Sequence, residues 1–131
     1  MPYSLSWEPR GVCRRFHGDV SIAERLASFE AICRDPRFDE LRYTLTDYRA
    51  VEAYEVSAAA TREIAAFHLA PHRSNPRIRI AAVAVRPDVV AAIRDFMAQG
   101  LAPQPYELFT SERAARRWLG PQAMAARPER V

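Results

Sequence analysis

Alternating apolar and polar residues open the chain. Residues 3–7 read Tyr-Ser-Leu-Ser-Trp, which has the two-residue period of a β-strand. Residues 8–11, Glu-Pro-Arg-Gly, place Pro second and Gly fourth, as a type I turn prefers. Alternation resumes over residues 12–17, so residues 3–17 are predicted to form a β-hairpin.

The period changes to that of a helix after this hairpin. Ser21 and Glu24 have the spacing of a capping box, in which each side chain accepts a hydrogen bond from a backbone N–H of the first turn. Apolar residues then recur every three or four positions as far as Cys33, which is typical of a helix with one buried face. Asp35-Pro36 ends the pattern.

A strand, a loop and a second helix come next. Residues 41–47 alternate, and Asp47 stands at the predicted end of this strand. Residues 48–57 have the polar, Glu-rich composition of a loop. Ser57 is placed to cap the following helix, which Pro71 ends.

The last third of the chain repeats the strand–helix alternation. Residues 77–85 become apolar on both faces, as a strand covered by helices on each side should be. Residues 87–99 begin with Pro-Asp, which suits the first turn of a helix. A short strand at 106–109 and a helix at 110–119 complete the domain, and residues 121–131, with two prolines and no apolar period, are expected to be a frayed tail.

These elements follow the order β-β-α-β-α-β-α-β-α. A hairpin followed by strand–helix alternation predicts an α/β fold, with a five-stranded mixed sheet, four helices and right-handed crossovers. One domain would cover residues 1–120.

Charge and residue types narrow the function. The formal net charge is only +3, and all 19 basic residues are arginines. Without lysine the chain has no Schiff-base lysine and no phosphate-binding P-loop lysine. The longest apolar run, residues 80–85, is far short of the roughly 20 residues that cross a membrane. No signal-peptide pattern opens the chain, so we expect a cytoplasmic protein with no membrane span.

Sites for metals, catalytic thiols and nucleic acids are weakly supported. His68 and His72 have the four-residue spacing of a metal pair on a helix, but Pro71 between them would break that helix. Cys13 and Cys33 are expected to be free thiols, because they lie on different elements of a cytoplasmic protein. The arginines are interspersed with acids and accompany no recognition motif. We therefore expect no metal, no cofactor, no enzyme activity and no nucleic-acid partner.

Four segments, in order, resemble the SpoIIAA-like family of the STAS group, the sulphate-transporter and anti-sigma-factor-antagonist domains, which are also grouped with SEC14-like proteins. They are FHGDVS, DPRFDELRYTLTDYR, RIRIAAVAV and YELFTSERAARRWL, and the resemblance covers roughly residues 3–120. It implies a small bacterial binding module and not an enzyme. STAS domains generally dock to partner proteins, and relatives similar to SEC14 are suspected of holding an apolar ligand.

The resemblance also bears on a phosphorylation switch. In phosphorylatable STAS antagonists the strand ends in Asp, and after one residue a phosphoacceptor Ser and a Gly open a helix. Asp47 and Tyr48 match the first two positions, but Arg49 stands in place of the Ser and Ala50 in place of the Gly. Arginine cannot accept a phosphoryl group, so the switch is lost at this position. Ser57 lies too far along the chain to replace it.

The strand end at Asp47 is the candidate site, since the carboxyl ends of parallel strands form the crevice in which α/β proteins bind ligands. The candidate partner- or ligand-binding residues are Asp47, Tyr48, Arg49, Tyr54 and Arg86. The alternative is that Asp47 only accepts hydrogen bonds from its own loop while Arg49 is a solvated turn residue.

Two functions stay open. The first is a regulatory or adaptor module that binds a protein partner, or a second copy of itself as a homodimer, through the 47–57 loop. The second is a carrier or sensor of a small apolar or lipid-like ligand, with Tyr48 and Tyr54 at the mouth of a pocket. An apolar cavity of roughly 300 Å³ or more would favour the carrier, and a closed sheet–helix interface would argue against it.

Overall fold

The computed structural model describes residues 2–67, 69–100 and 103–126. Its strands are β1 (Tyr3–Glu8), β2 (Gly11–Val20), β3 (Tyr43–Tyr54), β4 (Arg79–Val83) and β5 (Tyr106–Phe109). Its helices are α1 (Ile22–Arg34), α2 (Ala58–Phe67), α3 (Leu69–Ser74), α4 (Pro87–Ala98), α5 (Glu112–Leu119) and α6 (Pro121–Ala125), with a 3-10 helix η1 at Pro36–Glu40. The predicted α/β fold and element order are confirmed, and α1, α2, α4 and α5 are the four predicted helices.

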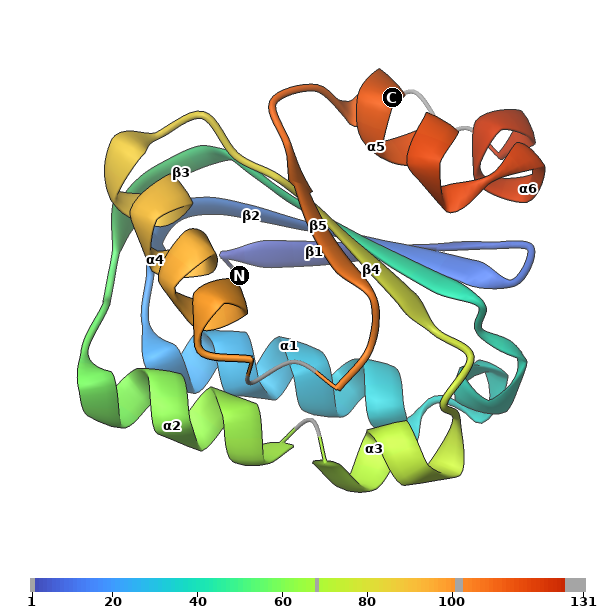
Figure 1. Ribbon diagram of the computed structural model, residues 1–131, viewed down its shortest axis with the longest axis horizontal. Helices are drawn as coiled ribbons and strands as arrows, with labels where there is room; N and C mark the ends of the chain where they lie inside the picture. Colours follow the sequence, from blue (N-terminus) through green and yellow to red (C-terminus); the bar gives the residue numbers. More distant parts are fainter. Residues whose placement is uncertain (1, 68, 101–102, 127–131) are drawn as a thin grey trace.

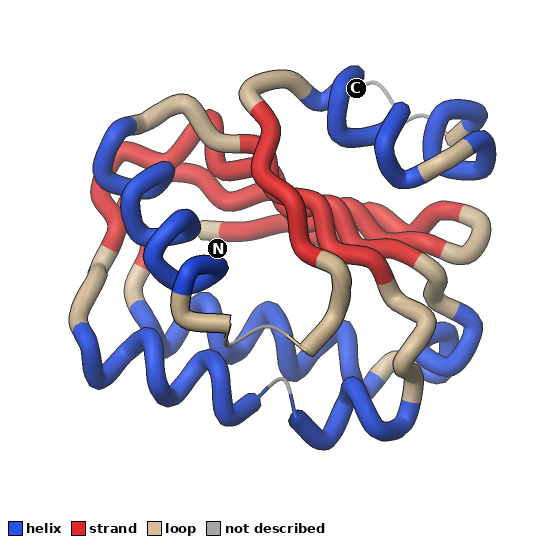
Figure 2. The backbone as a smooth tube through the Cα atoms, in the orientation of Figure 1, coloured by secondary structure: helices blue, strands red, loops and turns tan. Residues whose placement is uncertain are grey.

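The sheet separates two layers of helices (Figures 1 and 2). Its strand order is β1-β2-β3-β4-β5, with β1 antiparallel to β2 and the other neighbours parallel. Each right-handed crossover to the next strand in this order returns to the same face, so α1, α2, α3 and α4 share one face. Helix α5 follows the last strand and packs on the other face, with α6 beside it.

The core has a part on each face of the sheet. Under α1 and α4, one buried cluster includes Phe16 and Ile93, and a second includes Val12 and Ile32. On the other face, a third cluster joins Leu45 of β3 to α5 and includes Ala81 and Val83 of β4. The sheet therefore buries side chains on both faces, as the apolar strand at 77–85 predicted.

The hairpin turn differs from the expected type I turn. Arg10, its third residue, has a φ of 61°, whereas a type I turn needs a negative φ at that position. A positive φ there is a feature of a type II turn, which usually takes Gly or Asn at this position. Pro9 suits the second position of either type, so the turn type could not be read from the proline.

The predicted helix caps are present. Ser21 Oγ accepts a hydrogen bond from the Glu24 backbone N–H at 3.2 Å, and Glu24 Oε1 accepts one from the Ser21 N–H at 2.9 Å, which completes the capping box of α1. Ser57 Oγ accepts from the Ala60 N–H at 3.0 Å and so caps α2. Within the described residues, no helix combines the length and apolar character that crossing a bilayer requires.

Strand β3 does not end at Asp47, and the expected 47–57 loop is wrong for most of its length. The strand continues to Tyr54, which pairs with Val20 of β2. Two register shifts in this pairing, between Arg15 and His17 and between Gly18 and Asp19, interrupt the alternation that marks a strand. Only residues 55–57 connect β3 to α2.

The C-terminal segment also differs from the prediction. Residues 121–131 were expected to be a frayed tail, but residues 121–125 form α6, in which Ala123 is fully buried. Arg116 of α5 holds this helix, because its Nη1 donates to the carbonyl oxygens of Ala123 at 2.9 Å and Ala126 at 3.1 Å. Residues 127–131 lie outside the described residues.

Candidate functional site

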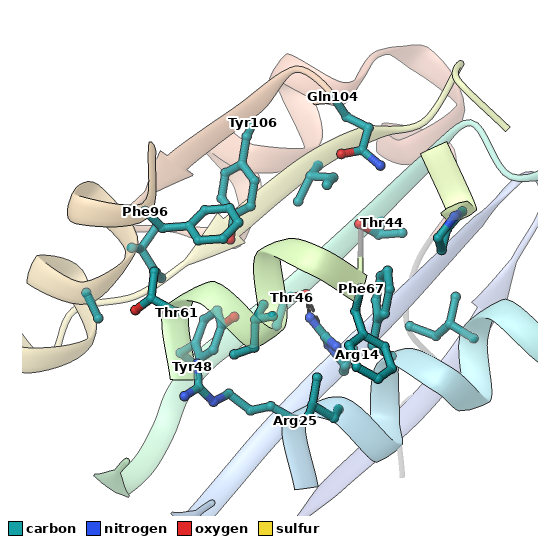
Figure 3. A pocket seen from close by; sticks show the side chains of 18 of the residues that line it. Arg14, Arg25, Thr44, Thr46, Tyr48, Thr61, Phe67, Phe96, Gln104 and Tyr106 are labelled. Atoms are coloured by element: carbon teal, nitrogen blue, oxygen red, sulfur yellow. Dashed lines mark hydrogen bonds between the residues drawn. The ribbon is translucent and has the colours of Figure 1, made fainter. Parts of the chain in front are cut away.

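A cavity of about 90 Å³ lies between the sheet and the layer formed by α1–α4. Strands β2, β3, β4 and β5 form its floor, and α1, α2 and α4 contribute most of its walls. Its lining is mainly aliphatic and aromatic, with a few polar side chains among them (Figure 3). A largely apolar hollow with a few placed polar groups is the usual composition of a small-molecule site.

Strand alternation places polar side chains in the floor of this cavity. Leu45 and Cys13 belong to the cluster under α5, so their sequence neighbours point to the opposite, helix-covered face. Thr44 and Thr46 of β3 and Arg14 of β2 line the cavity for this reason. Thr44 is paired in register with Val12 and Ile80 of the second cluster, and Thr46 with Arg14 and with Ala82 of the first.

Tyr48 and Tyr54, two of the predicted site residues, both line the cavity. Tyr48 is buried, stacks on Phe16 with ring centroids 5.4 Å apart and meets the Tyr54 ring edge-on at 5.7 Å. Burial raises the pKa of Tyr54 well above its ordinary value. On another side of the cavity, the rings of Phe96 and Tyr106 lie 5.8 Å apart.

The wall formed by α2 is the most open side. This helix makes its main contacts with α1 and α3 and not with a strand. Phe67 and Val56 line the cavity but are 40% and 50% exposed. An open hollow of about 480 Å³ between the start of α2 and the C-terminal part of α4 shares Val56 and Thr61 with the cavity. The cavity is therefore bordered by solvent at this end.

Two arginines are the charged groups of the cavity lining. Arg14 donates from Nε and Nη2 to Thr46 Oγ1, at 3.3 and 3.1 Å, and from Nη1 to Ser28 Oγ at 2.9 Å. Arg25 of α1 donates from Nη1 to the Tyr54 hydroxyl at 2.7 Å and from Nη2 to the Glu55 carbonyl oxygen at 2.6 Å. All of these acceptors are neutral oxygens.

Asp47 and Arg49 lie on the opposite face of the sheet. Asp47 Oδ1 accepts from the Arg49 backbone N–H at 3.0 Å and from Arg49 Nε at 2.9 Å, and Oδ2 accepts from Arg49 Nη2 at 2.8 Å and from Arg15 Nη1. Both arginines also pair with Glu112 of α5. Burial raises the pKa of Asp47, but the hydrogen bonds and charges of Arg49 and Arg15 outweigh burial and leave that pKa below its ordinary value.

This cluster continues into a buried ion pair under α5. Arg116 donates from Nη1 and Nη2 to the two carboxylate oxygens of Glu8, at 2.9 and 2.7 Å, and from Nε to Glu112 Oε2 at 2.8 Å. The Tyr43 hydroxyl also donates to Glu8. The network joins three carboxylates to three guanidinium groups: Glu8, Asp47 and Glu112 to Arg15, Arg49 and Arg116. Its charges balance, which suits a structural role in holding α5 to the sheet.

Arg86, the remaining candidate, belongs to neither group. It precedes α4, where its Nε pairs with Asp88 Oδ1 at 2.8 Å in a largely exposed ion pair. The structure therefore distributes the five predicted site residues over three places and brings only Tyr48 and Tyr54 together at a cavity.

The thiols are poorly placed for nucleophilic catalysis. Cys13 is buried, and burial raises its pKa to about 12; burial also raises the pKa of the half-buried Cys33 to about 11. A thiolate is the reactive form, so neither thiol is activated near neutral pH. The spacing of His68 and His72 was judged a poor metal site from the sequence, and His68 lies outside the described residues. In the part of the chain that the structure describes, no group of three or more His, Cys, Asp or Glu side chains could hold a metal ion.

Sequence reasoning missed the polar floor of the cavity. The positions of Thr44 and Thr46 carried a signal for it. These residues alternate with Tyr43 and Leu45, so in a sheet with helices on both faces the threonines point to one helix layer and Tyr43 and Leu45 to the other. Arg14 carries the same signal in β2. Arg25 and Gln104 gave no local signal. Gln104 is buried at the cavity, and its Oε1 has no hydrogen-bond partner among the described residues.

No protein-family model and no curated protein matches this sequence. The resemblance to the SpoIIAA-like family therefore stays a prediction, and the function has to be argued from the geometry of the site.

Proposed function

We propose that the protein is a non-catalytic module that binds a small apolar ligand between its sheet and the layer formed by α1–α4. The observation that carries this proposal is the cavity lined by Tyr48 and Tyr54. Protein interiors are close-packed and contain few voids larger than a water molecule. A hollow of 90 Å³ at the centre of a sheet–helix interface therefore calls for an occupant.

The volume of the cavity limits the size of a ligand that can bind while α2 stays in place. This volume does not reach the roughly 300 Å³ that was expected to favour a carrier, and it is smaller than the ~150 Å³ engineered cavity that takes up benzene. A larger ligand requires a wall to move outward. Helix α2 is suited to this, because its main contacts are with α1 and α3 and the open hollow adjoins it. Displacing α2 would join the two spaces.

Native mass spectrometry tests the proposal on protein purified under gentle conditions from its own host. We expect an added mass of a few hundred daltons that is lost on denaturation. The Ala92→Phe variant should lose this mass, because Ala92 of α4 lines the cavity and a phenyl ring would fill it. Its matched control is Ala91→Phe, since Ala91 is the preceding residue of α4 and is exposed.

Two results would contradict the proposal. One is a bare protein mass in the wild type together with no uptake of apolar probes added to the purified protein. The other is an added mass that survives in Ala92→Phe, with that variant folded by circular dichroism, since the ligand would then lie elsewhere.

The adaptor function, in which the protein binds a protein partner, stays a prediction, and Arg49 is the candidate contact residue. Its side chain is 41% exposed, whereas that of Asp47 is 9% exposed and engaged by Arg49 and Arg15. A partner could therefore contact Arg49 but not Asp47. In a pull-down from the host, Arg49→Ala should lose partner proteins that wild type and Arg113→Ala retain, and equal recovery by all three would remove this surface from consideration.

A further inference from the structure

The two arginines of the cavity differ from the arginines on the other face of the sheet. Arg15, Arg49 and Arg116 each pair with at least one carboxylate. Among the described residues, no carboxylate forms a salt bridge with Arg14 or Arg25, whose hydrogen-bond acceptors are hydroxyl and carbonyl oxygens. The charges of the ion network under α5 are balanced within it, whereas the two arginines of the cavity have no carboxylate partner among the described residues.

The hydrogen bonds of Arg25 are also incomplete. Its Nε is buried and has no hydrogen-bond partner among the described residues. The guanidinium carbon lies 4.3 Å from the centroid of the Tyr54 ring, and that of Arg14 lies 4.9 Å from the Phe16 ring. Such cation–π contacts stabilise a cation, but they leave its charge uncompensated.

Arg14 and Arg25 are half-buried, and a charge partly removed from water loses part of its hydration, which an opposite charge normally replaces. A guanidinium group fits a small oxyanion well, since its N–H groups form a planar fork that matches two oxygens. The rest of the lining, which includes the aromatic rings of Tyr48, Phe96 and Tyr106, suits an apolar body. The cavity thus combines two positive groups with an apolar surface.

We propose that the ligand is an amphipathic organic anion, with an apolar body and a small head such as a carboxylate, and that Arg14 and Arg25 bind the head. This inference rests on the proposed function, because it assumes that the cavity holds a ligand. The two guanidinium groups belong to neighbouring elements, and both residues line the cavity. The Ser28 Oγ that accepts from Arg14 Nη1 donates to the backbone carbonyl oxygen of Arg25 at 2.8 Å, so the two residues are also joined through one side chain.

Three probes of equal chain length and different charge separate this inference from the proposed function. Isothermal titration calorimetry of the wild-type full chain would compare octanoate, 1-octanol and octylammonium, each below its aggregation concentration. We expect octanoate to bind at least about 10-fold more tightly than octanol, since hydrogen bonds to charged groups are worth enough for such a ratio. Octylammonium should bind most weakly. This comparison needs no variant and so does not depend on whether a variant folds.

Variants then assign the charge preference to residues. Arg14→Met and Arg25→Met should each lower the affinity for octanoate about 10-fold and leave that for octanol unchanged. Arg94→Met is the control, because Arg94 is exposed on α4 and does not line the cavity.

The outcomes that would overturn the inference are distinct from those that would overturn the proposed function. Octanol binding as tightly as octanoate, or octylammonium binding best, would overturn the anion inference and leave the apolar site standing. Binding of none of the three probes would count against the proposed function itself.

Discussion

Arg10 adopts a backbone conformation that residues with a side chain rarely take. Its φ of 61° costs about 1–2 kcal/mol for a non-glycine residue. The turn keeps it because Glu8 and Gly11 must pair across the hairpin, and because the Arg10 carbonyl oxygen accepts a hydrogen bond from the Arg42 N–H at 2.7 Å. The strain at this residue is thus imposed by the strands on both sides of it.

Replacing Arg10 with glycine should stabilise the protein. Glycine takes a positive φ freely but loses more backbone entropy on folding, so the net gain in the free energy of unfolding should be about 0.5–1 kcal/mol. Urea denaturation of Arg10→Gly, with Arg10→Ala as the control that keeps the strain, measures it. An equal gain in both variants would mean that the arginine side chain, and not the turn conformation, is unfavourable.

At the scale of elements, one side chain, Arg116, contacts α5, α6 and the sheet together. Arg116 is 6% exposed and contacts Glu8 of β1, Glu112 of its own helix and two carbonyl oxygens at the end of α6. Burial lowers the pKa of Arg116, but the hydrogen bonds that it donates to the two carboxylates outweigh burial and raise that pKa. The contacts of this residue therefore add to the apolar cluster and the Glu112 ion pairs that hold α5 to the sheet, and they connect α6 to both.

The Arg116→Met variant should lower the free energy of unfolding by about 3–5 kcal/mol, because it leaves Glu8 buried without a positive partner. It should also release α6, which would appear as faster amide hydrogen exchange over residues 121–126. Arg117→Met is the matched control, since Arg117 is the next residue of the helix and is exposed. A loss below about 1 kcal/mol would show that the ion pair contributes little to holding α5.

At the scale of the whole molecule, the sheet has two different faces. One face carries a charge-balanced network that joins β1, β2 and β3 to α5. The other carries apolar clusters, the cavity and two arginines without carboxylate partners among the described residues. The ion network and the proposed ligand site thus lie on opposite sides of one sheet, so the residues of each can be varied with little direct effect on the other.

The network makes the stability of the whole molecule depend on pH. Burial raises the pKa of both Asp47 and Glu112, but the hydrogen bonds and charges of their arginine partners outweigh burial and leave both pKa values lowered. A carboxylate with a lowered pKa in the folded state stabilises the protein above its unfolded pKa, here about 4. This stability is lost as the pH falls through the folded pKa.

Urea denaturation at pH 7, 5, 4 and 3 should show a free energy of unfolding that declines mainly below pH 4 to 5. The decline should be shallower in Glu112→Gln, which removes one of the two carboxylates, and unchanged in Glu63→Gln, because Glu63 is exposed on α2. A wild-type stability that stays constant from pH 7 to pH 3 would contradict a linked role for these groups.

The sequence by itself determined the elements and their order. The alternation of residues 3–7, the capping box of Ser21 with Glu24 and the cap at Ser57 are local signals, because strand and helix periods and N-caps depend on neighbouring residues. Local signals also reach far enough to predict a parallel sheet, since strand–helix alternation permits few other topologies. Local signals did not predict that β3 continues beyond Asp47. The alternation is irregular there, and pairing with β2 maintains the strand.

Only the tertiary structure decided which residues meet. Asp47 and Tyr48 are adjacent in the chain but lie on opposite faces of the sheet, one in the ion network with Glu112 and the other in the cavity with Arg25. Side chains that follow one another in a strand point in opposite directions, so a site predicted as a run of neighbouring residues was divided between two faces. The polar groups of the cavity come from β2, β3, α1, α2 and the segment before β5, and their convergence depends on how these elements pack in space.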